Sequence, residues 1–236
     1  MGLKIGVPSK GRLMEQCFDW FGARGVVMRR TGNEREYSGA IDGVEGAAMV
    51  LLSAGEIPRE LAAGRIHLGV TGTDLVRETL ADWRAAVLEL AEMGFGHADL
   101  IIAVPEAWVD VETLDDLDAA AAAFRAAHGF RLRIATKYHR LVRDYLRAHG
   151  VADYQLVDSQ GATEGTIRNL TAEAVADITS TGATLRANHL KILNAPPVLR
   201  SQATLFAARS ADWAPVRAAA SALMARLGLP DDAGLW

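Results

Sequence analysis

The sequence has few of the residues on which most recognisable active sites are built. Its single cysteine, Cys17, cannot form a disulfide bond within the chain, as is typical of proteins from a reducing compartment. The apolar pattern around Cys17 predicts a place in the core rather than a role as a nucleophile. The six histidines lack the spacing of metal ligands, no Ser/His/Asp order indicates a catalytic triad, and the P-loop sequence is missing. We therefore expect neither a metal ligand set nor covalent catalysis.

Long apolar runs and a strong net charge are also missing. The densest apolar run, residues 100–104, has the length of a strand, whereas a membrane span needs roughly 18 to 20 apolar residues. The apolar run near the N-terminus is too short for a secretory signal. The net charge of −4 argues against a nucleic-acid partner, and half of the 236 residues are apolar. These features predict a globular cytoplasmic protein of one or two domains that binds neither membranes nor nucleic acids.

Short apolar runs alternate along the chain with segments of helical periodicity. Strands are expected at residues 3–7 and 175–178, for example, and a single long strand at residues 199–207. The alternation predicts an α/β fold in which mostly parallel sheets are flanked by helices.

Two breaks in this pattern, at residues 97–99 and 194–197, enclose a segment with an alternation of its own. We therefore predict two lobes: residues 1–98 with 196–236 form the first, and residues 99–195 form the second. This is the plan of the type II periplasmic-binding-protein-like fold, in which the ligand cleft lies between the lobes.

The most informative stretch of the chain runs from Asp177 to Asn188. An apolar run is followed by a turn rich in hydroxyl groups and then by a segment that is compatible with a helix. The first turn of a helix offers free backbone N–H groups and the positive end of the helix dipole, which suit a phosphate monoester. A glycine in the turn lets the backbone approach the anion, and an acidic residue before it can accept hydrogen bonds from sugar hydroxyls.

This pattern favours a site for a ribose 5-phosphate, and the alternative is an ordinary capped helix after a loop. The residues of the predicted site are Asp177, Ser180, Thr181, Gly182, Ala183 and Thr184.

A second turn, with Lys10, Gly11 and Arg12, follows the first predicted strand. Its two cations can hold a pyrophosphate or a triphosphate, with Arg12 as a bidentate fork and Lys10 as a point charge. An exposed basic turn without a ligand is the alternative.

A third turn contains Thr71, Gly72 and Asp74. It can place backbone N–H groups or the Asp74 carboxylate at a nucleotide. Alternatively, Asp74 is a residue of the first helical turn that stabilises the helix dipole.

Four segments, in the same order along the chain, resemble the ATP phosphoribosyltransferase family, which catalyses the first step of histidine biosynthesis. They are the opening strand with its basic turn, the Ile-Pro and Thr-Gly-Thr-Asp sequences within residues 56–74, the Arg-Ile-Ala-Thr-Lys-Tyr sequence of residues 133–138, and the Asp-x-x-Ser-Thr-Gly-x-Thr-Leu-x-x-Asn-x-Leu string of residues 177–190. The resemblance extends over about residues 3–205. Each motif is weak alone, but four in order are specific together.

The resemblance implies the same two-lobed fold and a glycosyltransferase activity. The reaction would transfer the phosphoribosyl group of phosphoribosyl diphosphate to N1 of ATP adenine and release pyrophosphate. The implied catalytic residues are Lys10, Arg12 and Asp177. Phosphoribosyl diphosphate would bind to Glu164 as well as to Asp177 and the turn that follows it. ATP would bind to Lys10, Gly11, Arg12, Thr71, Gly72 and Asp74.

The reaction also implies Mg²⁺, which would be coordinated mostly by substrate oxygens and water. Two positions depart from the family's pattern. Thr166 and Ile167 stand where the family has Ala-Pro after its acidic residue, and His139 stands where it usually has proline. The shape of both loops is therefore open.

The family has a long form with an additional regulatory domain and a short form without it. This chain resembles the short form, which works in a hetero-oligomer with a regulatory subunit similar to histidyl-tRNA synthetase. The resemblance therefore implies that partner, and self-association of the chain is expected.

Two other functions share parts of these patterns. A non-catalytic sensor of a phosphorylated metabolite or amino acid would have the same fold and cleft but would release no pyrophosphate. A purine-salvage phosphoribosyltransferase would accept a free base in place of ATP.

Overall fold

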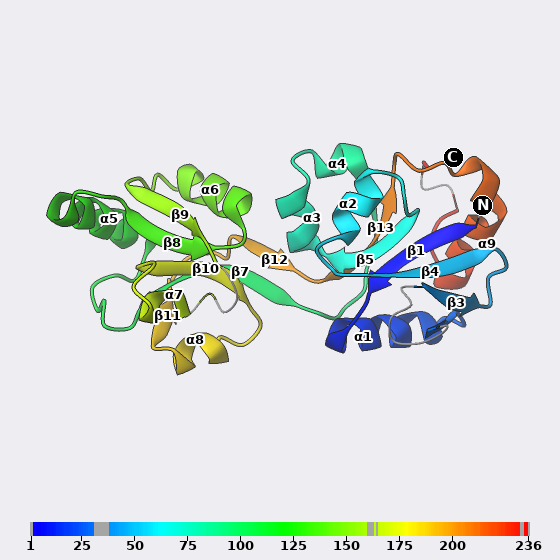
Figure 1. Cartoon of the computed structure of the whole chain (residues 1–236), viewed down its shortest axis with the longest axis horizontal. Coiled ribbons are helices and arrows are strands. Elements are labelled where there is room, and N and C mark those ends of the chain that lie inside the picture. Colours follow the sequence, from blue (N-terminus) through cyan, green and yellow to red (C-terminus); the bar gives the residue numbers. More distant parts are fainter. Residues whose placement is uncertain (1, 31–37, 160–162, 164, 232–233, 236) are drawn as a thin grey trace. The chain divides into compact units, whose positions relative to one another are not determined.

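The computed structural model describes residues 2–30, 38–159, 163, 165–231 and 234–235, and it divides the chain into two compact units (Figure 1). Unit 1 contains Met1–His97 and Gln202–Trp236, and unit 2 contains Ala98–Ser201. Among the described residues, no helix has both the length and the apolar character that crossing a membrane requires.

Unit 1 is built on a seven-stranded sheet with the order β2-β3-β4-β1-β5-β13-β6. Its strands are β1 (Leu3–Pro8), β2 (Val27–Arg30), β3 (Ser38–Asp42), β4 (Ala47–Leu52), β5 (Leu68–Gly72), β6 (Val87–Glu92) and β13 (Ala203–Ala208). β1 pairs in parallel with β4 and with β5, whereas the outer pairs are antiparallel. Because β1 and β5 are parallel neighbours, the turns that follow them leave the same edge of the sheet.

Two apolar clusters pack against the sheet of unit 1. The helices of this unit are α1 (Gly11–Gly22), α2 (Ile57–Ala62), α3 (Thr73–Thr79), α4 (Trp83–Ala86), the 3₁₀ helix η1 (Ala214–Val216) and α9 (Arg217–Leu227). One cluster joins the buried faces of α1 and α9, including Phe21 and Leu223, to the sheet. The other joins Leu61 of α2 and Val76 of α3 to Phe206. Burial of the sheet by both clusters explains why β1 reads as a nearly continuous apolar run.

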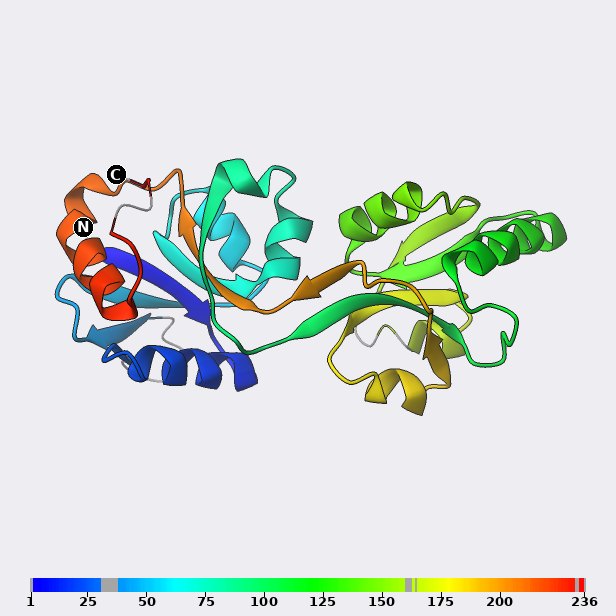
Figure 2. The same cartoon turned by 180° about the vertical axis from the view of Figure 1, so that it is seen from behind.

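Unit 2 contains a smaller sheet with the order β11-β7-β10-β8-β9, and β12 also pairs with β7. Its strands are β7 (Ala98–Pro105), β8 (Leu132–Thr136), β9 (Tyr154–Asp158), β10 (Ala174–Thr179), β11 (Leu190–Ile192) and β12 (Leu199–Ser201). Its helices are α5 (Leu114–His128), α6 (His139–Ala148), α7 (Gly165–Arg168) and α8 (Ala183–Ala187). Helices α5 and α6 lie on one side of this sheet, and α7 and α8 lie on the other (Figures 1 and 2).

Both sheets are mixed, which corrects the expectation of mostly parallel strands. β8 is parallel to β9 and to β10, but β7 is antiparallel to all of its partners. In unit 1, residues 43–46 join β3 to β4 in an antiparallel hairpin. The alternation of apolar and helical segments predicts crossovers well, but it does not reveal strands that are joined without a helix.

The segment that returns to unit 1 differs from the prediction. The predicted single strand at residues 199–207 is two strands, because β12 pairs with β7 in unit 2 and β13 pairs with β5 and β6 in unit 1. The predicted second lobe spans residues 99–195, whereas unit 2 spans Ala98–Ser201. The difference at the second boundary arises because β12 pairs within unit 2. A short strand beyond a Pro-Pro break is paired by tertiary contacts that local sequence does not encode.

His67 directly precedes β5 and uses both ring nitrogens to hold unit 1 together. Nδ1 accepts a hydrogen bond from the Lys4 N–H at 3.0 Å, and Nε2 donates to the Asp212 carbonyl oxygen at 3.3 Å. The ring also meets Trp213 edge to face, with the ring centroids 5.3 Å apart. This arrangement needs the neutral ring, and burial lowers the pKa of His67 below its ordinary value of 6.5.

The stability of unit 1 should therefore depend on the protonation of His67. Since its folded-state pKa lies below 6.5, its contribution is present above that pH and is lost as the pH falls through the folded-state pKa. We expect His67→Gln, which keeps a donor and an acceptor but does not titrate, to reduce the loss of unfolding free energy between about pH 7.5 and about pH 5.5. Urea unfolding followed by tryptophan fluorescence measures this. The matched control is His128→Gln at an exposed histidine, and equal pH dependence of all three proteins would contradict the expectation.

Candidate functional site

The turn between β10 and α8 contains most of the predicted phosphate site. Thr179 Oγ1 accepts a hydrogen bond from the Gly182 N–H at 2.8 Å, and Thr181 Oγ1 accepts one from the Ala183 N–H at 3.3 Å. Both N–H groups belong to the start of α8, where no carbonyl of the helix can accept from them. An anionic oxygen can take the place of either hydroxyl, so the turn presents donors that suit an anion.

A pocket of about 220 Å³ lies against this turn, and the described residues that line it all belong to unit 2. The predicted residues that line it are Asp177, Ser180, Thr181, Ala183 and Thr184. Gly182 lines a second pocket, which shares Leu185 with the first. Glu164 lies outside the described residues. The volume is below the roughly 300 Å³ at which pockets for whole drug-sized ligands begin, so it suits one part of a larger substrate.

Asp177 lies at the pocket as a half-buried carboxylate near the end of β10. Its Oδ1 accepts a hydrogen bond from the Ile178 N–H at 2.8 Å. This bond holds the carboxylate close to its own backbone and leaves Oδ2 for a hydroxyl donor or a cation.

Thr163 and Thr179 also line the pocket, although neither belongs to the predicted set of site residues. Thr163 is 1% exposed, and its Oγ1 lies 2.6 Å from Ser159 Oγ. Ser159 follows β9 and Thr179 ends β10, and both strands run parallel to β8. They therefore reach the same edge of the sheet. A position at the end of a strand is the signal that could have found Ser159 and Thr179, whereas Thr163 lies in a loop with no periodic pattern.

Arg186, in the last turn of α8, stabilises the turn of residues 180–184, which is called the phosphate turn below because of its predicted role. Its Nη2 donates a hydrogen bond to the Thr181 carbonyl oxygen at 3.0 Å. Gly182 has a φ of +69°, and a Cβ at this position would lie 2.9 Å from Arg186 Nη1. The left-handed backbone favours glycine here, and a Cβ would also force the end of the Arg186 side chain to move.

The basic turn of unit 1 follows β1 and is held to the sheet by its backbone. The Ser9 N–H donates to the Leu52 carbonyl oxygen at 2.8 Å, and α1 begins at Gly11. Lys10 and Arg12 are both exposed, on either side of Gly11. The structure thus presents both predicted cations to solvent at the carboxyl end of β1.

The junction of β5 and α3, residues 71–74, differs because its threonine and aspartate side chains are buried. Thr71 is fully buried, and its hydroxyl donates to the Ala54 carbonyl oxygen at 2.8 Å. Thr73 Oγ1 lies 3.2 Å from Thr204 Oγ1, and Asp74 is 5% exposed in the first turn of α3. Gly72 is half-buried between them. Of the three predicted ATP-site residues at this junction, Gly72 is thus the one with an accessible surface, through its backbone.

Comparison with known proteins decides the family. The family model for ATP phosphoribosyltransferase (HisG) matches residues 53–228, about three quarters of the chain. The chain belongs to the ATP phosphoribosyltransferase family. It is 77% identical over 230 residues to the ATP phosphoribosyltransferase of Cereibacter sphaeroides, covering 98% of both chains. It is also 49% identical over 211 residues to the enzyme of Afipia carboxidovorans, of which it spans 65%.

The activity follows from this membership. The chain is a phosphoribosyltransferase that transfers the phosphoribosyl group of phosphoribosyl diphosphate to N1 of ATP adenine, with release of pyrophosphate, in the first step of histidine biosynthesis. The curated relatives favour this activity over a non-catalytic sensor or a purine-salvage enzyme.

Solved structures agree with the fold of the ATP phosphoribosyltransferase family. An ATP phosphoribosyltransferase complex (HisG:HisZ) from Thermotoga maritima matches with a TM-score of 0.72 at 20% identity, covering 96% of both chains. The glutamate-bound GluR0 ligand-binding core matches with a TM-score of 0.52 at 11% identity, covering 96% of this chain and 90% of that one. The expected type II periplasmic-binding-protein-like fold is confirmed by these neighbours.

His139 departs from the pattern of the ATP phosphoribosyltransferase family. It stands where the family usually has proline. His139 begins α6, and its Nε2 lies 2.7 Å from Asp158 Oδ1 at the end of β9.

Cys17 is fully buried, and burial raises the pKa of its thiol to about 12. The thiol is therefore protonated at neutral pH, and its predicted place in the core is confirmed.

The geometry of Gly182 gives a direct test of the phosphate turn. We expect Gly182→Ala to raise the apparent KM for phosphoribosyl diphosphate at least about tenfold, or about 1.4 kcal/mol, because the new Cβ displaces Arg186 and reshapes the turn. Steady-state kinetics at saturating ATP measures this.

Gly150→Ala is the matched control for the backbone. Gly150 has a φ of +73°, similar to that of Gly182, but a Cβ there meets no atom within 4 Å. Both substitutions should destabilise the fold by roughly 1 kcal/mol, and only Gly182→Ala should affect the substrate. An equal change of KM in both variants would show that the effect is one of stability.

Proposed function

We propose that the pocket at the end of β10 binds the ribose 5-phosphate part of phosphoribosyl diphosphate. One observation carries this proposal. Apart from Gly182, the five predicted site residues that the structure describes all line one pocket, at a turn that presents hydroxyl groups and the backbone N–H groups at the start of α8. In this assignment the turn from Ser180 to Thr184 holds the phosphate. Asp177 accepts hydrogen bonds from the ribose hydroxyls, and Glu164 contributes to the same site.

The chemistry of the transfer suits these residues. Displacement of pyrophosphate from C1 of the ribose passes through a state with oxocarbenium character, for which no covalent intermediate on the protein is needed. The half-buried Asp177 carboxylate stabilises the developing positive charge of the sugar. The phosphate turn fixes the other end of the ribose, so the orientation of C1 toward the attacking N1 is set by binding.

The proposed role of the basic turn is to neutralise the polyphosphates. Lys10 and Arg12 are exposed at the carboxyl end of β1 and bind ATP and the leaving pyrophosphate, with the Gly11 backbone between them. Gly72, the last residue of β5, belongs to the same ATP site in this proposal. Thr71 and Asp74 belong to this site as positioning residues, because their side chains are buried.

The proposed metal ion is Mg²⁺. Within the part of the chain that the structure describes, no group of three or more His, Cys, Asp or Glu residues could hold a metal ion. The donors at the pocket, one carboxylate and several hydroxyls, fit an ion that takes its remaining ligands from substrate phosphates and water. When bound, Mg²⁺ would neutralise charge on the departing pyrophosphate. Asp177 is the residue best placed to contribute an oxygen.

The role of Arg12 can be separated from simple ATP binding. If its cation neutralises departing pyrophosphate, Arg12→Ala should lower kcat more than it weakens ground-state binding of either substrate. We expect a loss of kcat of at least about tenfold. Arg217→Ala is the matched control, because Arg217 is also an exposed cation in the first turn of a helix. Wild-type kcat for Arg12→Ala would refute the role.

We also propose that the chain works in the cytoplasm in a hetero-oligomer with a regulatory subunit similar to histidyl-tRNA synthetase, and that it self-associates. One observation supports the partner: the similar Thermotoga maritima structure is a HisG:HisZ complex.

Feedback inhibition provides the test of this assembly. We expect histidine to have little effect on the isolated chain and to inhibit it when the regulatory subunit is present, because an effector acts only through states that it binds with different affinity. The assay contains ATP, phosphoribosyl diphosphate and Mg²⁺, and ultraviolet absorbance reports the product. Half-maximal inhibition of the chain alone by micromolar histidine would show that regulation needs no partner.

A further inference from the structure

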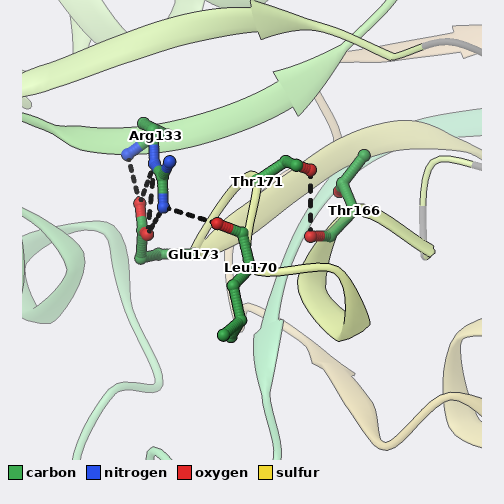
Figure 3. A network of polar contacts seen from close by, with 5 residues as sticks. All are labelled: Arg133, Thr166, Leu170, Thr171 and Glu173. Atoms are coloured by element: carbon green, nitrogen blue, oxygen red, sulfur yellow. Dashed lines mark hydrogen bonds and ion pairs between the residues drawn. The ribbon is translucent and has the colours of Figure 1, made fainter.

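A half-buried ion pair between Arg133 and Glu173 lies in unit 2, outside the described lining of the pocket (Figure 3). Arg133 belongs to β8, Glu173 directly precedes β10, and their side chains are 28% and 14% exposed. Arg133 Nε lies 3.2 Å from each carboxylate oxygen of Glu173, and Nη2 donates to Oε1. The Arg133 N–H also donates to Oε2 at 2.7 Å. A forked, partly desolvated pair of this kind is stronger and more directional than an exposed one.

The same guanidinium holds a residue whose backbone is unfavourable. Leu170 has a φ of +55°, which a residue with a side chain rarely adopts. Leu170 is 79% exposed, so apolar burial does little to offset the cost of this backbone conformation. Arg133 Nη2 donates to the Leu170 carbonyl oxygen at 2.9 Å, and the Leu170 N–H donates to the Ile167 carbonyl oxygen at 3.1 Å. The turn that follows α7 is thus fixed from outside by Arg133.

Hydrogen bonds continue from this turn to the wall of the pocket. The N–H and the hydroxyl of Thr171 both donate to the Thr166 carbonyl oxygen, at 3.0 and 3.1 Å. The N–H and the hydroxyl of Thr166 donate to the Thr163 carbonyl oxygen, at 3.1 and 2.6 Å. Thr163 lines the pocket. Helix α7 has four residues and is too short to be stable without such external contacts.

We propose that Arg133 and Glu173 are positioning residues of the phosphoribosyl-diphosphate site, because they hold Leu170 and, through Thr171 and Thr166, the pocket wall at Thr163. This inference rests on the proposed assignment of the pocket. When the wall is loosened, binding must also order it, so affinity for phosphoribosyl diphosphate falls. Bound substrate restores the wall, so kcat at saturation and the KM for ATP change little.

Arg133→Lys is the informative variant, because it keeps the charge but loses the fork and the bond to Leu170. We expect the KM and the calorimetric Kd for phosphoribosyl diphosphate with Mg²⁺ to rise about three- to tenfold, with kcat within about twofold of wild type. Arg65→Lys is the matched control. Arg65 pairs with Glu60 in unit 1 in the same forked way, with N–O distances of 2.7 and 2.6 Å, and should leave both constants unchanged.

A second substitution tests the path through Leu170. Glycine adopts a positive φ without strain, and the exposed Leu170 side chain contributes little packing. In the Arg133→Lys background, Leu170→Gly should therefore recover at least half of the lost affinity on a logarithmic scale. Amide exchange of residues 165–171 should be faster in Arg133→Lys than in wild type, and slower again in the double variant.

Three results would overturn the inference. A lowered melting temperature with unchanged affinity would mean that the pair only stabilises unit 2. A fall in kcat together with equal rises in the KM for ATP and the KM for phosphoribosyl diphosphate would also mean that the pair only stabilises unit 2. Failure of Leu170→Gly to restore affinity would show that Arg133 does not act on the pocket through Leu170.

If Arg133→Lys does not fold, Glu173→Gln, which keeps the shape of the partner, replaces it with the same expectations. Gly182→Ala separately tests the assignment of the pocket. Failure of that assignment can therefore be distinguished from failure of the positioning role of Arg133 and Glu173.

Discussion

The unequal pairing of β10 with its two neighbours is the constraint on which the site in unit 2 depends. The antiparallel pairing with β7 continues to the end of the strand, where Thr179 lies opposite Asp99. The parallel pairing with β8 ends three residues earlier, where Ala176 lies opposite Thr136. Asp177 is thus held rigidly by β7 at the point where β8 has ended. Ligand sites of α/β proteins form at such strand ends because the backbone there is both fixed and accessible.

The local part of this site could be predicted from sequence. A strand, a turn with glycine and a helix start are all encoded by neighbouring residues, and Gly182 has the left-handed backbone that its residue type favours. The remaining part could not. Thr163 and Leu170 acquire their places through hydrogen bonds with residues as far as Arg133, and a leucine gives no indication of a positive φ. Periodicity likewise missed the hairpin of β3 and β4, since no helix separates these strands.

The two threonine-rich segments show why similar motifs needed a structure to be told apart. Thr71 and Gly72 end β5, a strand that is buried over four of its five residues, so Thr71 lies in the core and its hydroxyl bonds to Ala54. Residues 180–184 follow β10, whose last three residues are half-buried or exposed, and the hydroxyl groups of Ser180, Thr181 and Thr184 lie at the surface. Burial of the preceding strand, which the residues of these segments do not encode, decides whether their hydroxyl groups bond within the core or remain accessible at the surface.

The path of the chain into and out of unit 2 has a consequence for how such a protein can be remodelled. The first strand of the unit, β7, and its last, β12, are antiparallel partners, with Ala98 opposite Ser201. The two ends of a segment that contains every described residue of the pocket lining are therefore side by side, as in domains that tolerate insertion and circular permutation. Unit 2 has the topology of a transplantable module: a short linker could close it into a ring, or it could be spliced into another scaffold without altering the order of its strands.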